Sequence, residues 1–332
     1  MSSAALDRLL AILLVVQLAS GLLTLRAGVP ATAPLFWLHG LVAGALLVAA
    51  AEKLRRSIGP AIRHRRWRRL LLGALLTFLV AAALAGGFTW VASGRIWSIG
   101  PWTILTLHVW AALAIIPIAV FHLLPRRWRL LRPSAARGRP GISRRTLLAT
   151  GGIVALGAVA WGAANLLDVV RGGARRFTGS RWLPVGGIPP STTFYGEPAP
   201  SIDVTAWRLE VTGRVDRSMR LDLAALAALG VEERDPPLDC TSGWVMTTTW
   251  SGTPLAAVLI AAGADPDARH VIVRSATGWS AAFNRDEADG CLLASHVAGE
   301  PLPAANGAPC RLVVPTRRGL DWVKWVTEIH VA

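Results

Sequence analysis

Five long apolar runs fill the first half of the chain, and short alternating runs replace them in the second half. The apolar runs cover residues 6–25, 35–54, 70–92, 102–124 and 146–167. Each is close to the roughly 20 residues that a helix needs to cross a bilayer. The pattern therefore predicts a four-helix membrane domain in residues 1–125 and a fifth transmembrane helix in residues 146–170.

Basic residues between the apolar runs predict the orientation of these helices. Lysine and arginine number eight in residues 53–69 and eight in residues 126–145, whereas the other two connections carry only Arg26 and Arg95. Basic loops stay in the cytoplasm. We therefore expect a multi-pass protein in the lipid bilayer of a bacterial cell membrane, with a cytoplasmic N-terminus and an extracytoplasmic C-terminal domain.

The net positive charge belongs to this membrane half. Residues 1–170 contain 19 lysines and arginines against 3 acidic residues, whereas residues 171–332 contain 16 against 17. A basic patch can indicate nucleic-acid binding, but these basic residues flank apolar runs as they do in membrane proteins. We expect no nucleic-acid partner.

Histidines occur within or beside the apolar runs, and an ionisable residue inside a membrane helix usually marks a functional site. His39 lies near the start of the second run, and His64 lies in the basic loop before the third. His108 and His122 lie 14 residues apart in the fourth run, which is close to four helical turns. Facing imidazoles in a helical bundle can hold haem iron. Alternatively, these histidines are interfacial side chains of a plain anchor.

Two segments of this half resemble the b-type cytochromes that serve hydrogenases and formate dehydrogenases. They are LFWLHG (35–40) and WTILTLHVWAALAIIPIAVFHLLPRRW (102–128). The resemblance implies that His39 and His108 bind an outer haem b and that His122 belongs to an inner haem b. One or two haems would then exchange electrons with a membrane quinone or quinol.

The first run departs from that family because it contains Gln17 and no histidine. His64 would therefore have to complete the inner haem site from the edge of the membrane. A haem-free anchor that receives electrons from a soluble partner stays open as the alternative.

Residues 126–145 are rich in arginine, proline and glycine, which predicts a basic cytoplasmic linker. At its end, SRRTLL (143–148) places Arg144 and Arg145 before the fifth run and resembles a twin-arginine export signal, with leucine where phenylalanine is often found. That route exports folded proteins, so we expect its machinery as a partner of the last domain. The alternative is the ordinary positive charge that precedes a membrane helix.

From residue 171 onward, alternating runs broken by glycine and proline predict an α+β domain rich in strands. Strands are expected at residues 207–213, 270–276, 310–315 and 322–331, and a short helix at residues 221–229. The predicted fold class is therefore an all-α membrane bundle of five helices followed by a β-rich α+β domain.

Three stretches of this domain resemble the sulfite oxidase superfamily of molybdenum-pterin oxidoreductases. They are LDCTSGWVMTTTWSGTPLAAVL (238–259), GEPLPAANGAPCRLVVP (299–315) and WVKWVTEIHV (322–331), with support from residues 190–215. The resemblance implies that residues 171–332 form a sulfite-oxidase-like domain with a molybdenum-molybdopterin cofactor. It also implies that Cys240 is the catalytic thiolate ligand of molybdenum, a role that suits a soft sulfur. The residue alone would equally fit a buried free cysteine.

Similarity to the bacterial periplasmic methionine-sulfoxide reductases implies further cofactor-binding residues. They are Asn306, Arg311, Lys324, Phe194, Tyr195 and Ser275, with Thr277 as the alternative to Ser275. Arginine and lysine suit the phosphate of the pterin. The alternative for the two basic residues is a solvated strand face.

The remaining cysteines and the surroundings of Cys240 complete the prediction. Three cysteines exclude a complete disulfide framework, so Cys291 and Cys310 are expected in the core, and a pairing between them stays open. The residues near Cys240 predict a mostly apolar pocket; they are Thr241, Ser242, Trp244, Met246 and Trp250. Arg317 and Arg318 could reach the site from a later loop. This setting favours a small or protein-bound oxide over sulfite.

The sequence therefore predicts a membrane-bound molybdenum oxidoreductase that transfers an oxygen atom and exchanges electrons with the quinone pool through haem b. The resemblance to methionine-sulfoxide reductases favours the reductive direction. Two alternatives stay open. One is a molybdopterin domain on a haem-free anchor, and the other is a non-catalytic membrane-anchored binding protein in which Cys240 is merely buried.

Overall fold

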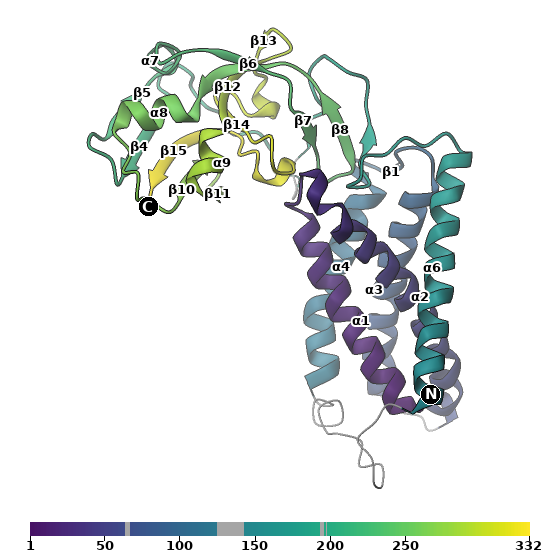
Figure 1. Cartoon of the computed structure of the whole chain (residues 1–332). Helices are drawn as coiled ribbons and strands as arrows, with labels where there is room; N and C mark the ends of the chain where they lie inside the picture. Colours follow the sequence, from purple (N-terminus) through teal and green to yellow (C-terminus); the bar gives the residue numbers. More distant parts are fainter. Residues whose placement is uncertain (64–66, 125–142, 193–195, 197) are drawn as a thin grey trace. The chain divides into compact units, whose positions relative to one another are not determined.

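A computed structural model describes residues 1–63, 67–124, 143–192, 196 and 198–332 of the chain. These residues form two compact units (Figure 1). The first unit contains Met1–Thr24 and Ala31–Arg181, and the second contains Leu25–Pro30 and Trp182–Ala332. The division lies close to the change in hydropathy near residue 170.

Long helices build the first unit. They are α1 (Ser3–Thr24), α2 (Ala33–Arg63), α3 (Trp67–Ala92), α4 (Ile104–Leu123) and α6 (Arg144–Val170). Within the described ranges, five helices are long and apolar enough to cross a membrane. The predicted bounds agree within three residues except at the end of the second run, where α2 continues beyond residue 54 to Arg63. Helix α4 begins at Ile104, shortly after the predicted start at Trp102. That residue lies in a hairpin of β1 (Ser98–Ile99) and β2 (Trp102–Thr103), and the Thr103 side chain caps α4 by accepting from the Thr106 amide.

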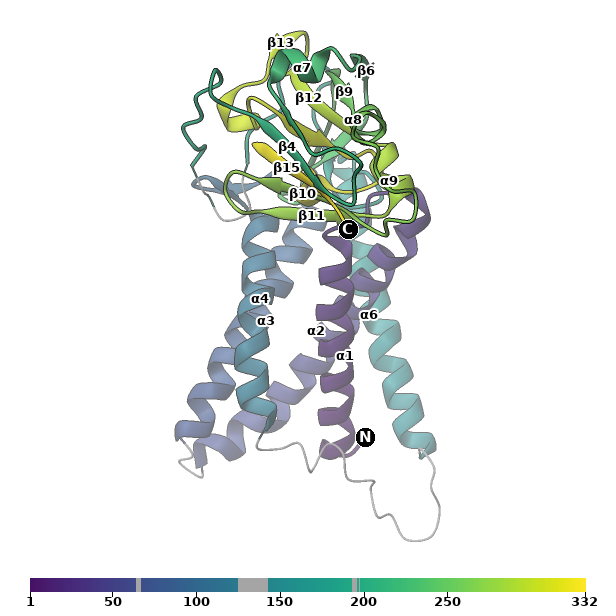
Figure 2. The ribbon, with the colours of Figure 1, turned by 90° about the vertical axis from the view of Figure 1, so that its left-hand side faces the viewer.

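The helices pack side by side, with α2 against α1 and α6, and α3 against α4 and α6. Figure 2 shows α3 beside α4 and α1 beside α2. Glycines allow the closest approach, between α2 and α6. A Cβ on Gly44 would lie 2.1 Å from the Gly157 carbonyl oxygen, and a Cβ on Gly40 would lie 2.1 Å from Nε1 of Trp161. Small residues four apart are typical of tightly packed membrane helices. The fifth helix is therefore an integral part of the bundle.

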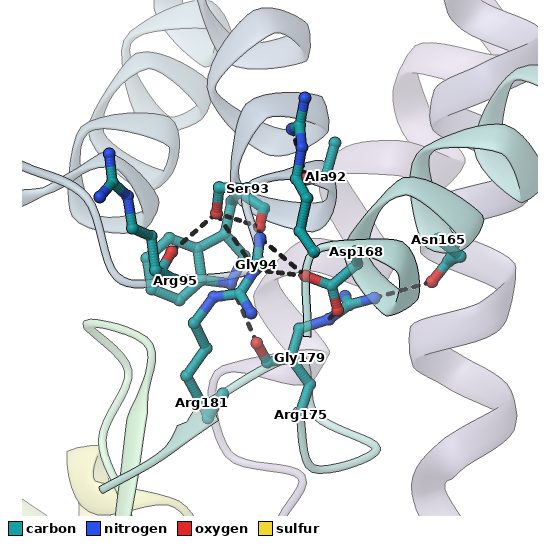
Figure 3. Close-up of polar contacts among 12 residues, drawn as sticks. Ala92, Ser93, Gly94, Arg95, Asn165, Asp168, Arg175, Gly179 and Arg181 are labelled. Carbon is teal, nitrogen blue, oxygen red and sulfur yellow. Dashed lines mark hydrogen bonds and ion pairs between the residues drawn. The ribbon is translucent and has the colours of Figure 1, made fainter. Parts of the chain in front are cut away.

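A buried ion cluster lies where α6 ends (Figure 3). Asp168 Oδ1 accepts from Arg181 at 2.8 Å and from the Gly94 amide at 3.0 Å, and Oδ2 accepts from Arg175 at 2.7 Å. Arg181 also donates to the Trp90 carbonyl at 2.7 Å. The cluster thus fastens the segment after α6 to the end of α3, a feature that the sequence pattern did not predict.

Three main sheets build the second unit. The sheet ordered β11-β10-β15-β4-β5 contains β4 (Leu209–Gly213), β5 (Met219–Leu221), β10 (Val271–Ser275), β11 (Ser280–Phe283) and β15 (Val326–Val331). The sheet ordered β13-β12-β9-β6 contains β6 (Glu232–Arg234), β9 (Trp250–Pro254), β12 (Leu292–Val297) and β13 (Glu300–Pro301), with β14 (Arg311–Val313) also paired to β12. The third sheet contains β3 (Arg181–Trp182), β8 (Trp244–Thr247) and β7 (Pro237–Asp239).

Short helices and turns connect these strands. The helices are α7 (Leu223–Ala227), α8 (Leu255–Ala262) and α9 (Arg285–Asp289), and the 3-10 turns include η3 (Ala304–Asn306) and η4 (Gly319–Asp321). Strand β15 runs parallel to β4, whereas β10 runs antiparallel to both β11 and β15. The unit is thus a mixed domain of helices and strands, as predicted.

The elements predicted for this domain are present, with one correction. The strand expected at residues 322–331 begins only at Val326. Trp325 has a φ of 53°, which breaks the extended path. As a result, the chain turns at residues 322–325 and brings Lys324 against Gly307, where a Cβ would lie 3.1 Å from Lys324 Cα.

Candidate active site

Cys240 begins the tight turn between β7 and β8. Its amide donates to the Trp244 carbonyl at 2.8 Å, and its carbonyl accepts from the Gly243 amide at 2.9 Å. Gly243 has a φ of 100°, a conformation that residues with side chains rarely adopt. Cys240 is partly exposed, which suits a metal ligand better than it suits a buried structural cysteine.

Two hydroxyl groups lie next to the Cys240 sulfur. Ser242 Oγ lies 2.8 Å from Sγ, and Thr192 Oγ1 lies 3.0 Å from it. Ser242 belongs to the same turn, whereas Thr192 comes from the segment that precedes β4. Two hydroxyl groups from separate segments therefore contact the sulfur.

A buried ion pair supports the turn that carries Cys240. Arg318 Nε donates to Asp239 at 3.1 Å, and another guanidinium nitrogen donates to the Cys240 carbonyl at 3.1 Å. Arg318 therefore reaches the site, as the sequence suggested. Arg317 is directed elsewhere, since it forms an ion pair with Glu287, and its hydrogen bonds lower the pKa of that carboxyl.

Asn306, Arg311 and Lys324 converge around Gly307. Arg311 donates to the Asn306 carbonyl at 3.0 Å, and Lys324 Nζ donates to the Ala305 carbonyl at 2.8 Å. Gly307 has a φ of 115°, and a Cβ there would lie 3.2 Å from Arg311 Cβ. The three residues predicted to contact the pterin thus meet at a position that only glycine fits without strain.

Arg311 is a buried cation beside the Cys240 turn. It is 4% exposed, and its guanidinium lies 5.1 Å from the Trp250 ring and 5.7 Å from the Trp322 ring. Burial lowers its pKa to about 10, against an opposing effect of charge at Cys240. Among the described residues, its Nε has no hydrogen-bond partner and it forms no ion pair with a carboxylate. A buried positive charge of this kind is suited to an anionic ligand.

The other predicted cofactor contacts have different outcomes. Ser275 is buried, and its hydroxyl interacts with Thr277 of the same turn, 3.1 Å away. That turn adjoins the site because the Ala276 amide donates to the Trp325 carbonyl at 2.8 Å. Phe194 and Tyr195 lie outside the described residues.

The large apolar side chains near Cys240 are buried. Trp244, Met246 and Trp250 are at most 6% exposed. The Trp250 ring packs edge-on against Trp322, with ring centroids 5.6 Å apart. Both rings lie beside the Arg311 guanidinium.

The two remaining cysteines are also core residues. Cys291 and Cys310 are free and fully buried, and burial raises the pKa of each to about 12. The pairing between them that the sequence left open is absent. Neither thiol takes part in the site around Cys240.

In the first unit, the structure brings His39 and His108 together. Their ring centroids lie 6.2 Å apart, with an angle of 89° between the ring planes. Glycines flank both rings, since a Cβ on Gly21 would lie 3.1 Å from His39 and a Cβ on Gly87 would lie 3.2 Å from His108. The two rings therefore lie edge to face, next to small residues.

Hydrogen bonds define which ring nitrogens carry protons. His108 Nδ1 lies 2.7 Å from the Ala83 carbonyl, which can only accept, so this nitrogen donates. Ser20 donates its hydroxyl proton to the Gln17 carbonyl and therefore accepts from His39 Nδ1, 3.0 Å away. With Nδ1 donating, a neutral ring keeps a lone pair on Nε2. The Gln17 amide nitrogen lies 2.9 Å from Nε2 of His39.

The inner pair of histidines is only partly described. His122 lies near the end of α4, and a Cβ on Gly73 of α3 would lie 3.9 Å from its ring. His64 lies outside the described residues.

Sequence reasoning missed three residues of these sites. Thr192 contacts the sulfur from a loop without a regular pattern, so no local signal identified it. Gln17 and Ser20 did carry a signal, because two polar residues one helical turn apart in an apolar run share a helix face.

The structural class of the second unit agrees with comparisons to known proteins. The family model for the oxidoreductase molybdopterin binding domain matches residues 196–332. The chain therefore belongs to this family and is a molybdopterin-dependent oxidoreductase. Cys240, Asn306, Arg311 and Lys324 all lie within the matched range.

Three relatives illustrate the similarity. The catalytic subunit MsrP of the protein-methionine-sulfoxide reductase of Gluconobacter oxydans is 34% identical over 226 residues, 57% of this chain and 69% of that protein. MsrP of Xanthomonas campestris pv. campestris is 32% identical over 150 residues, 40% of this chain and 47% of that protein. The putative protein-methionine-sulfoxide reductase subunit YedZ1 of Azospira oryzae is 30% identical over 145 residues, 43% of this chain and 55% of that protein. The chain thus spans only part of the length of each relative.

Proposed function

We propose that the second unit holds the molybdenum-molybdopterin cofactor with Cys240 as a ligand of molybdenum. Asn306, Arg311 and Lys324 would contact the pterin and its phosphate. The observation that carries this proposal is the buried Arg311 cation, which no described carboxylate neutralises, beside a partly exposed thiol. When bound, the cofactor supplies two-electron oxygen-atom transfer.

The substrate proposed is a sulfoxide, either free or within a protein, and the direction is reduction. The names of the two MsrP relatives support this choice. Reduction of a sulfoxide to a thioether takes up two electrons and two protons and releases one water. In this chain, Arg318 and Asp239 hold the turn that presents Cys240, while Lys324 holds the opposite segment through the Thr192 carbonyl at 3.1 Å.

The first unit is proposed to be the membrane anchor. Its five helices have the length and composition of membrane spans, and the basic connections favour a cytoplasmic N-terminus. The catalytic unit would then be extracytoplasmic. Arg144 and Arg145 are exposed at the first turn of α6, where export machinery can reach a twin-arginine signal.

The anchor is also proposed to carry haem b between His39 and His108. These two residues would hold the haem iron, since their rings come from two helices of the bundle and their centroids lie 6.2 Å apart. Each Nδ1 is held as a donor, which leaves Nε2 for iron, as is usual for metal-bound histidine. The Gln17 amide would give way to the metal. Haem supplies one-electron transfer from a membrane quinol.

A second haem, held by His122 with His64, completes the proposal for the inner side of the anchor. It rests on the 14-residue spacing from His108 and on the small Gly73 beside the His122 ring.

Metal and haem stoichiometry of the purified full chain tests these assignments together. Wild type should contain one molybdenum and one or two haems per chain and should reduce methionine sulfoxide when supplied with a reduced quinone analogue. Cys240→Ala should lose sulfoxide reduction and keep haem. His108→Ala should lose one haem and keep molybdenum. Retention of full activity by Cys240→Ala would refute the molybdenum assignment, and absence of haem from wild type would leave a haem-free anchor.

A further inference from the structure

The Cys240 sulfur lies within hydrogen-bond reach of two hydroxyl groups from separate parts of the chain. Ser242 Oγ is 2.8 Å from Sγ, and Thr192 Oγ1 is 3.0 Å from it. The two hydroxyl oxygens are 3.3 Å apart, and the Ser242 hydroxyl donates to Thr192 Oγ1 over that distance unless the shorter contact to the sulfur takes its single proton. A thiol needs no such pair, because it has one proton and accepts only weakly.

The direction of these hydrogen bonds follows from the charge of the sulfur. A cysteine bound to a metal is a thiolate, which has no proton and can only accept. A hydroxyl within reach of it then acts as the donor. Hydrogen bonds to an ionised acceptor are about twice as strong as those between neutral groups.

We propose that Thr192 and Ser242 are positioning residues that donate hydrogen bonds to the molybdenum-bound Cys240 sulfur and thereby tune the metal's reduction potential. The inference rests on the proposed role of Cys240 as a molybdenum ligand. It adds two residues that act on the metal through that ligand.

Both hydroxyls are held in place by the surrounding structure. Lys324 Nζ donates to the Thr192 carbonyl at 3.1 Å, and the neighbouring Ser191 donates to the Ala305 carbonyl at 2.6 Å. Ser242 lies in the turn that Arg318 fixes through the Cys240 carbonyl. Because Lys324 and Ala305 adjoin the proposed pterin contacts, binding of the pterin and placement of the Thr192 hydroxyl are linked.

The expected effect has a definite sign. A donor to a metal-bound sulfur withdraws electron density from it and favours the reduced metal, as hydrogen bonds to cluster sulfurs do in iron–sulfur proteins. Removal of one hydroxyl should therefore make the Mo(V)/Mo(IV) midpoint potential more negative. The shift expected is about tenfold in the ratio of the two states at a fixed potential, or about 59 mV for one electron.

The test uses the full-length holoenzyme and three single variants. Thr192→Val and Ser242→Ala remove the hydroxyls, and Ser242→Thr restores a donor at the second position. Ser280→Ala is the matched control, because Ser280 is exposed in β11. Molybdenum content is measured first, and an EPR-monitored redox titration then gives the Mo(V)/Mo(IV) potential of each protein.

The inference predicts full molybdenum content, a more negative potential in Thr192→Val and Ser242→Ala, and wild-type values in Ser242→Thr and the control. Loss of molybdenum from Ser242→Ala that Ser242→Thr restores would also support donation by the hydroxyl, whereas loss from both would count against it. Unchanged potentials at full molybdenum content would overturn it. If Cys240→Ala itself keeps the molybdenum signal, the proposed function fails instead.

Discussion

The buried Asp168 cluster offers the most direct test of how the helical unit is held together. Asp168 is 2% exposed and accepts from Arg175, Arg181 and the Gly94 amide (Figure 3). The substitution Asp168→Asn keeps the size and one acceptor oxygen but removes the charge. It therefore leaves two arginine side chains, 4% and 15% exposed, without their shared carboxylate.

The magnitude follows from the burial of the cluster. Removal of one partner from a buried ion pair costs about 3–5 kcal/mol, because the remaining charge is left uncompensated. If that cost appears as local opening, amide exchange should accelerate about 10²- to 10⁴-fold in the segments that the cluster joins. Those segments are residues 90–95 at the end of α3 and residues 171–181 after α6.

Hydrogen–deuterium exchange on the full chain in detergent measures this opening directly. Asp7→Asn is the matched control, because Asp7 pairs with Lys53 but is 43% exposed, and surface ion pairs contribute little. We expect fast exchange in both segments of Asp168→Asn and wild-type exchange in the control. Equal protection of both segments in Asp168→Asn and wild type would refute the structural role of the cluster.

Three further predictions concern packing, the cofactor and pH. Gly44→Leu should lower the free energy of unfolding of the helical unit by about 1–3 kcal/mol, since its Cβ would clash with the Gly157 backbone. Thermal unfolding in detergent measures this, with Gly162→Leu as the control because the space beside Gly162 is open. Equal stability of the two variants would contradict the prediction. Arg311→Met should lower pterin retention about tenfold, by loss of a charge-assisted contact, without destabilising the cofactor-free domain; unchanged pterin content on purification would contradict it. Glu287→Gln should destabilise the catalytic unit at neutral pH, because folding lowers the pKa of the Glu287 carboxyl. The ionised carboxylate therefore contributes to folding stability above pH 4.5, and that contribution is lost as the pH falls through the folded-state pKa. Urea unfolding should show a difference from wild type that shrinks in acid, and a difference that stays constant with pH would argue against this.

Much of the fold was accessible from the sequence because apolar run length and alternation are local properties. Run length located the long helices to within a few residues apart from the end of α2, which continues from the predicted residue 54 to Arg63, and alternation located β4, β10 and β14. The strand expected at residues 322–331 was partly wrong because the positive φ of Trp325 depends on its packing and leaves no trace in a hydropathy pattern.

Sequence motifs indicated candidate residues of the site. They did not indicate which side chains are buried or which distant residues come into contact, because tertiary packing determines both. Asn306, Arg311 and Lys324 lie together around Gly307, and their role as pterin contacts stays a prediction. Trp244 and Trp250 turned out to be buried, because a strand side chain's face depends on which sheets pack together. Thr192 is 48 residues from Cys240, and only the folded chain reveals such a contact.

The central claim is that the sulfur of Cys240 is bonded to molybdenum. X-ray absorption at the molybdenum edge counts sulfur neighbours directly and needs neither substrate nor turnover. The account predicts three sulfur neighbours in the wild-type protein, two from the pterin and one from the chain, and one fewer in Cys240→Ser at equal molybdenum content. The same number of sulfur neighbours in both proteins would contradict it.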